Sequence, residues 1–174
     1  NNLTESDIMV DSPTNNFCTL NPLIHDTEFA GVPNATYYEG NLKISTNTSG
    51  AASSNFFGTI GVSSGKWYWE AMKTGGNVDG AVGFATYNAN SRMAYYGNGN
   101  KYAASGSSSY GASWTTGDVI GIALDADTQS LTLYKNGVSQ GAISNALSSN
   151  DTYFPFGWDG SGSLYSIFVT NFGQ

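Results

Sequence analysis

Residues 117–141, GDVIGIALDADTQSLTLYKNGVSQG, decide the fold of this chain. The apolar run 119–124 and the alternating run 130–135 predict two strands, and the polar residues 125–129 between them predict a turn. The dipeptide Asn136-Gly137 then predicts a tight hairpin into a third strand, because both residues tolerate the positive φ of a primed turn. Such a meander cannot bury its apolar face alone, so the rest of the chain must supply a second layer.

The rest of the chain carries more short apolar runs, separated by turn-forming residues. A strand or hairpin is expected in each of residues 36–45, 56–60, 66–74, 80–86, 152–158 and 164–171. Within the run 66–74, Trp67 and Trp69 share one face. Tyr68 and Met72 share the other, so this strand is expected to be central and covered on both sides. About ten to thirteen short strands at this spacing predict an all-β fold, a two-sheet antiparallel β-sandwich of the jelly-roll type.

Charge and composition exclude several classes of partner. The chain has 13 acidic against 6 basic residues, a net charge of −7, and no basic run, so it is not expected to bind nucleic acid. No apolar run approaches the roughly 18–20 residues of a membrane span, so no membrane insertion is expected. The chain begins at Asn1 without a signal-peptide pattern, and we expect it to be a fragment of a longer polypeptide.

The residue types that carry most enzyme chemistry are scarce. Cys18 is the single cysteine, which excludes an internal disulfide and a cysteine-based zinc site. His25 is the single histidine and is expected to be a solvated loop residue, not the base of a Ser–His–acid triad. Glu70 is the only Glu in an expected strand and has no acid within three residues, whereas glycoside hydrolysis needs two carboxylates. We therefore expect no catalytic residues and no enzyme activity.

Two acidic turns could offer oxygen ligands to a hard cation such as Ca²⁺. They are Asp125-Ala126-Asp127, between two expected strands, and Asp159-Gly160, before the last one. Asp at strand ends is also ordinary turn chemistry, because its side chain bonds to nearby backbone N–H groups. We therefore expect no metal site and no cofactor.

Five groups of residues follow one another in order over about 110 positions. They are Gly65-Lys66-Trp67-Tyr68-Trp69-Glu70, Val82-Gly83-Phe84-Ala85, the meander 117–137, Phe154-Pro155 and Asn171-Phe172-Gly173. Together they resemble the motifs of the SPRY domain family. The resemblance implies a bent, concanavalin-like β-sandwich that acts as a non-enzymatic binding module, with long loops gathered at one end. We expect residues 16–174 to form this one domain, after a lead-in at residues 1–15.

A second, shorter resemblance concerns residues 11–23, DSPTNNFCTLNPL. This segment is similar to one that precedes SPRY-like modules in bacteriophage virion proteins, especially those of marine phages. It implies a virion or extracellular location, in a tail fibre or a capsid decoration protein. The partners implied are a host-surface glycan or protein, or neighbouring virion subunits. The domain is then expected to be one part of a larger chain that forms a homo-oligomer.

Residues 87–113 break the strand pattern and are expected to form a long loop. Nineteen of these 27 residues are Tyr, Ser, Gly or Asn, which is the composition of binding loops on immunoglobulin scaffolds. Five of them are tyrosines, whose rings can pack on the C–H faces of sugars. In the SPRY family, this segment and the loop after the Phe-Pro strand contribute to the ligand-binding face. The resemblance therefore assigns ligand binding to Tyr95, Tyr96, Asn98, Asn100, Tyr102, Trp158 and Asp159.

The ligand class and two alternative functions stay open at this point. Arg92 and Lys101 are the only cations in these loops, which makes an acidic peptide a poor fit and leaves a neutral glycan or a polar protein surface. A second hypothesis is a structural domain that cements a particle, with its loops packed on neighbouring subunits. A third is a concanavalin-type carbohydrate-active enzyme, which requires two carboxylates about 5–10 Å apart in a cleft.

Overall fold

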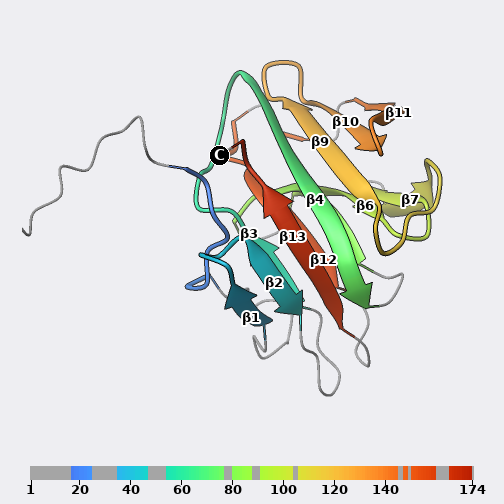
Figure 1. Ribbon diagram of the computed structural model, residues 1–174. Coiled ribbons are helices and arrows are strands. Elements are labelled where there is room, and N and C mark those ends of the chain that lie inside the picture. The colour runs from blue at the N-terminus through green and yellow to red at the C-terminus, as the bar shows by residue number, and fades with distance from the viewer. Residues whose placement is uncertain are drawn as a thin grey trace, which may run out of the picture.

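The described residues form thirteen strands in two antiparallel sheets that face each other (Figure 1). The structure is a computed structural model, and it describes residues 17–24, 35–46, 54–76, 80–87, 91–103, 106–144, 147–148, 150–159 and 165–173. The expected lead-in, His25 and the first part of the segment 11–23 lie outside the described residues. The arrangement confirms the predicted all-β, two-sheet antiparallel sandwich.

One sheet has seven strands in the order β1-β2-β13-β4-β9-β10-β11. These strands are β1 (Ala35–Tyr38), β2 (Lys43–Thr46), β4 (Lys66–Gly76), β9 (Val119–Asp125), β10 (Ser130–Lys135), β11 (Val138–Ile143) and β13 (Ser166–Asn171). The other sheet has six strands in the order β3-β12-β5-β6-β7-β8. These strands are β3 (Ser54–Phe57), β5 (Gly80–Ala85), β6 (Arg92–Tyr96), β7 (Asn100–Ala103), β8 (Gly106–Ser109) and β12 (Phe154–Asp159).

The predicted meander forms as β9, β10 and β11. β9 and β10 pair from Asp125 opposite Ser130, across the turn predicted between them. At the second turn, Asn136 and Gly137 have φ values of 49° and 79°, the left-handed conformation that a primed turn requires. The Asn136 side chain also accepts a hydrogen bond from the Val119 N–H at 2.9 Å, which ties this turn to the start of β9.

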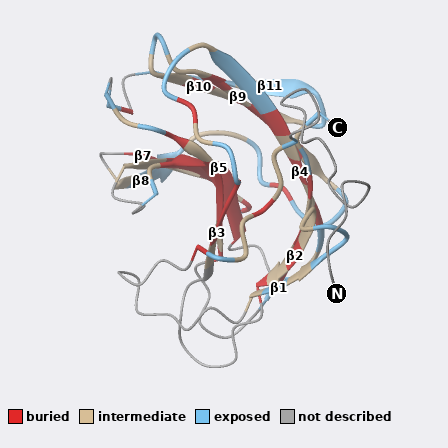
Figure 2. Ribbon diagram, turned by 90° about the vertical axis from the view of Figure 1, so that its left-hand side faces the viewer, coloured by how far each residue is buried: buried red, intermediate tan, exposed pale blue. Residues whose placement is uncertain are grey.

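Buried residues lie on both sheets where the sheets face each other (Figure 2). Their side chains form the main core. β5 is buried along its whole length. Phe56 of β3 packs against Phe168 of β13 with ring centroids 5.6 Å apart, and Trp69 of β4 meets Phe84 of β5 edge-on at 6.5 Å. Both pairs join one sheet to the other, so aromatic packing holds the two layers together.

β4 is central in its sheet, as predicted, but the prediction that it is covered on both sides is wrong. Trp69 and Ala71 face the core and are buried, whereas Tyr68 on the outer face is 53% exposed. The Tyr68 ring lies over Gly121 of β9, where an added side chain would collide with it. Its hydroxyl donates to the Glu70 carboxylate at 2.8 Å. A tyrosine is stable at such a position because its ring packs while its hydroxyl keeps a polar partner.

The predicted loop at residues 87–113 is also wrong, because β6, β7 and β8 lie within it. Tyr95 of β6 is fully buried rather than exposed. Its ring packs edge-on against Tyr110 at 5.3 Å and beside Trp114 at 6.1 Å, and its hydroxyl donates to the Ala112 carbonyl. Short strands near a sheet edge need an apolar residue only at the positions that face the core. The Gly/Ser-rich composition of the whole segment therefore gave no clear strand pattern.

Candidate functional site

Four side chains come together on the outer face of the six-stranded sheet. Arg92 and Tyr96 lie four residues apart on β6, so they leave the same face of the strand. Tyr102 comes from the neighbouring strand β7. Trp158 of β12 pairs opposite Ala81 of β5, which in turn pairs with Tyr96, so the register brings both rings over one small side chain. We call Arg92, Tyr96, Tyr102 and Trp158 the Arg92 cluster.

The rings of the Arg92 cluster meet edge to face, and two of them lie against the guanidinium group. Tyr96 and Trp158 have ring centroids 5.4 Å apart at an interplanar angle of 68°, and Tyr102 and Trp158 are 6.5 Å apart at 81°. The guanidinium carbon of Arg92 lies 4.5 Å from the Tyr102 ring centroid and 5.2 Å from that of Trp158. Cation–π attraction to two rings fixes the side chains before any ligand arrives.

The Arg92 cluster also offers hydrogen-bonding groups. Nε1 of Trp158 is buried and has no hydrogen-bond partner among the described residues. Burial raises the pKa of Tyr96 to about 12, while the charge of Arg92 acts in the opposite direction. The Tyr96 hydroxyl is therefore neutral near pH 7 and can donate or accept. The cluster can stack on the apolar face of a ligand and donate to its oxygen atoms.

Two of the seven predicted ligand residues lie inside the sandwich instead. Tyr95 and Asp159 are both fully buried, and the Asp159 carboxylate accepts a hydrogen bond from the Thr46 hydroxyl at 2.9 Å. Each is the immediate chain neighbour of a cluster residue, and successive side chains of a strand point to opposite faces. The expectation that these two residues face a ligand is therefore wrong.

Asn98 and Asn100 lie in and beside the turn between β6 and β7. The Asn98 side chain accepts a hydrogen bond from the Asn100 backbone N–H at 3.0 Å, and Asn100 pairs with Ser109 of β8. This is an Asx-type turn, so the two residues shape the backbone beside the Arg92 cluster. Asn98 is exposed, and ligand contact through either residue stays a prediction.

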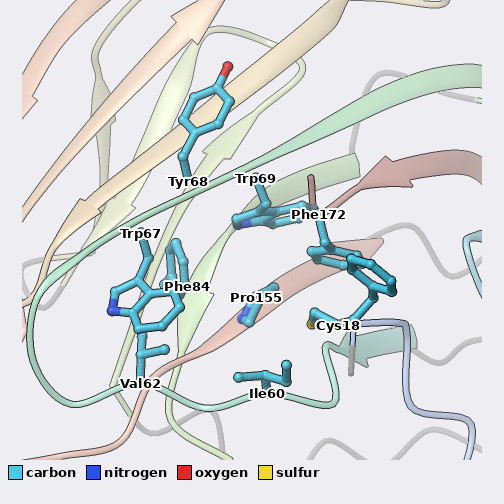
Figure 3. Close-up of a pocket in the computed structure, with 10 residues that line it drawn as sticks. Cys18, Ile60, Val62, Trp67, Tyr68, Trp69, Phe84, Pro155 and Phe172 are labelled. Atoms are coloured by element: carbon cyan, nitrogen blue, oxygen red, sulfur yellow. The ribbon is translucent and has the colours of Figure 1, made fainter. Parts of the chain in front are cut away.

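The sequence did not predict a cavity that opens between the layers elsewhere in the sandwich (Figure 3). It has a volume of about 200 Å³ and is lined mainly by aromatic and aliphatic side chains. We call it the Trp67 pocket, and its walls include Phe17, Ile60, Trp67, Trp69, Phe84 and Phe172. One signal of a pocket in the sequence was Trp67 itself. It is a large aromatic residue at the second position of an expected strand, directly after a turn.

The acidic turn after β9 uses its carboxylates for turn and ion-pair contacts. Asp125 accepts a hydrogen bond from the Thr128 N–H at 3.1 Å and pairs with the Lys66 ammonium at 3.4 Å. Asp127 accepts from the Gly65 N–H at 2.9 Å. In the described part of the chain, no three His, Cys, Asp or Glu side chains gather in a way that could hold a metal ion. The same residues contain no helix able to cross a membrane.

Comparison with known proteins identifies the family of this chain. The SPRY domain family matches residues 66–172, from the first residue of β4 to the residue after the end of β13. The chain belongs to the SPRY domain family. The match contains the whole Arg92 cluster, whereas Phe17 and Ile60 of the Trp67 pocket lie before it.

A solved structure agrees with this family assignment. The crystal structure of the SPRY domain of human HERC1 superposes with a TM-score of 0.67 at 19% sequence identity, covering 80% of this chain and 93% of that one. This similarity shows the shared fold. No curated protein matches the chain. SPRY domains are in general protein–protein interaction modules without catalytic activity.

Proposed function

We propose that this SPRY domain is a non-catalytic recognition module of a phage virion protein, a tail fibre or a capsid decoration. In this proposal it binds a host-surface glycan or protein through the Arg92 cluster. The observation that carries the proposed site is the convergence of two rings, Tyr102 and Trp158, on the Arg92 guanidinium, with the Tyr96 ring edge-on to Trp158. The Trp158 indole N–H beside them has no hydrogen-bond partner among the described residues. The virion setting is supported by the resemblance of residues 11–23 to phage segments.

The chemistry of the Arg92 cluster favours a neutral polar ligand. The C–H face of a sugar, or a flat apolar side chain, can pack against Tyr96 or Trp158, and its oxygens can accept from the indole N–H and the guanidinium. The chain itself is acidic, with a net charge of −7, so a strongly acidic ligand would meet repulsion away from Arg92. These properties suit a glycan or a polar protein surface.

A carbohydrate-active enzyme finds no support in the cavities that the structure describes. Among its described lining residues the Trp67 pocket has no carboxylate, and a second cavity beside β4 and β9 has Asp125 alone. Glycoside hydrolysis needs two carboxylates that face each other across the bond. Recognition without cleavage is therefore the function that we propose.

The experiment compares wild type with Trp158→Ala and Tyr96→Ala in glycan-array and host-cell binding. Alanine at a buried aromatic anchor of an interface costs about 2 kcal/mol or more, so each variant should bind about thirtyfold more weakly. Tyr165→Ala is the matched control, because Tyr165 is 49% exposed and lies outside the cluster. Trp158→Phe keeps a ring but removes the N–H, and it should fall between wild type and Trp158→Ala. Equal binding by wild type, Trp158→Ala and Tyr96→Ala would refute this site.

A further inference from the structure

The Trp67 pocket is separate from the Arg92 cluster. Pro155 of β12 lines the pocket, and Trp158 of the same strand belongs to the cluster. Three residues along a strand separate the two positions by about 10 Å, and side chains three residues apart point to opposite faces. One site lies between the layers and the other lies on the outer face, so a ligand of one does not occupy the other.

The rim of the Trp67 pocket exposes more apolar surface than a closed core would. Phe17 is 54% exposed, Trp67 46% and Ile60 38%, and all three line the same opening. Large apolar side chains that are exposed singly are common, but a contiguous group around a cavity marks an interaction site. Figure 3 shows Tyr68 on the other side of β4, turned away from this opening.

The walls of the pocket are held in place without a ligand. The Trp67 indole N–H donates to the Ser64 carbonyl at 2.7 Å, which fixes the exposed ring against the turn before β4. Trp69 stacks on Phe172 at 5.5 Å and meets Phe84 edge-on at 6.5 Å. A pre-formed aromatic wall lowers the entropy cost of binding.

One indole N–H in the pocket wall has no hydrogen-bond partner in the described part of the chain. Trp69 is 2% exposed, and its Nε1 has no hydrogen-bond partner among the described residues. Figure 3 shows the nitrogen edge of this ring turned toward the Trp67 and Phe84 side of the pocket. A buried donor of this kind is satisfied when a ligand brings an acceptor such as a peptide carbonyl. The Trp114 indole N–H also has no hydrogen-bond partner within the described ranges, but Trp114 does not line the pocket.

The charges beside the rim favour a basic partner. Lys66 and Asp125 form an ion pair at 3.4 Å, and the Asp127 carboxylate accepts a hydrogen bond from the Gly65 N–H at 2.9 Å. A Cβ added at Gly65 would lie 3.6 Å from the Trp67 indole nitrogen, so the Asp127 carboxylate lies near the Trp67 side of the opening. The Gly65 N–H carries no charge, so Asp127 keeps its negative field there.

We propose that the Trp67 pocket binds an extended segment of a partner protein, which inserts one aliphatic side chain of leucine or methionine size and carries basic residues beside it. The aromatic walls take the side chain, the Trp69 N–H takes a backbone carbonyl of the segment, and the Asp127 carboxylate attracts the flanking basic residues. The cavity of about 200 Å³ suits one such side chain, because sites for whole drug-sized ligands measure roughly 300–1,000 Å³. This inference does not depend on the function proposed for the Arg92 cluster.

The test titrates the ¹⁵N-labelled protein with three blocked peptides: acetyl-Arg-Leu-Arg-amide, acetyl-Arg-Gly-Arg-amide and acetyl-Glu-Leu-Glu-amide. One buried side chain and one hydrogen bond give a Kd of about 1 mM, so the titration runs to about 10 mM. The indole N–H resonance of Trp69, assigned by its loss in Trp69→Phe, should shift and saturate with Arg-Leu-Arg alone. The indole resonance of Trp158 should stay in place, which separates this test from that of the Arg92 cluster.

Cys18 provides an independent readout, because it is the single thiol of the chain and lines the pocket. With Arg-Leu-Arg at about ten times its Kd, the rate at which a thiol reagent modifies Cys18 should fall about elevenfold by mass action. Trp67→Ala should abolish both the shift and the protection, whereas Tyr165→Ala should keep them. No saturable Trp69 shift with Arg-Leu-Arg, equal shifts with the glycine or glutamate peptides, or retention of binding by Trp67→Ala would each overturn the proposal.

Discussion

The Arg92 cluster and the Trp67 pocket use the same residue type in opposite ways. In the cluster, rings lie on the outer face of a sheet and surround a cation, with Arg92 4.5 Å from the Tyr102 ring centroid. In the pocket, rings lie between the layers and line an apolar cavity of about 200 Å³, with the Trp69 N–H unpaired among the described residues. The face of the strand on which an aromatic residue lies therefore decides whether it builds a polar recognition surface or an apolar anchor site.

The largest expected effect is a difference in the free energy of unfolding between variants at the wall and at the rim of the Trp67 pocket. Trp69→Ala should destabilise the domain by about 3–5 kcal/mol, because it removes a fully buried ring from the core. Trp67→Ala should cost about 1 kcal/mol or less, since its ring is 46% exposed and loses one hydrogen bond. Urea unfolding followed by circular dichroism measures both. Similar losses in the two variants would mean that the rim is part of the core.

The next effect concerns the cation of the Arg92 cluster. Arg92→Met should lower the free energy of unfolding by about 1–2 kcal/mol, because Arg92 lies over two rings. Among the described residues, Lys101 lies over one ring, 5.6 Å from the centroid of Tyr110, so Lys101→Met should cost about 0.5 kcal/mol. Chemical unfolding of both variants at the same salt concentration provides the comparison. An equal or larger loss in Lys101→Met would argue against an organising role for Arg92.

A third effect is a pH dependence carried by Tyr96. Burial raises its pKa from 10.0 to about 12 in the folded chain, so the folded state keeps the phenol proton to higher pH than the unfolded state does. This contribution to stability is complete below pH 10 and is lost as the pH rises toward 12. Stability should therefore fall less steeply between pH 10 and 12 in Tyr96→Phe than in wild type. Identical slopes would show that Tyr96 ionises as in the unfolded chain.

The sequence predicted the parts of the fold that depend on local signals. Asn136 and Gly137 carry the left-handed conformation of a hairpin turn, and the flanking runs have a clear strand period, so the meander and the antiparallel sandwich follow from them. The motif resemblance led to the SPRY family, which the match over residues 66–172 confirms. Composition misled the prediction at residues 87–113, where one Gly and three Ser form the largely exposed strand β8.

The candidate sites were only partly predictable, because they depend on side-chain direction and on distant segments. Tyr95 and Tyr96 are identical neighbours, and the alternation that puts Tyr96 on the face of Arg92 and Tyr95 on the face of Met93 applies only once this segment is known to be a strand. The Trp67 pocket draws Phe17, Trp67 and Phe172 from widely separated parts of the chain. No local pattern can indicate that such residues meet, since their contact depends on the packed sandwich.

The most direct test of the account is a glycan and host-cell binding comparison of Trp158→Ala with Trp67→Ala. We predict that Trp158→Ala loses the ligands of the wild-type domain, about thirtyfold in affinity, while Trp67→Ala keeps them. Binding that survives in Trp158→Ala would contradict the assignment of recognition to the Arg92 cluster.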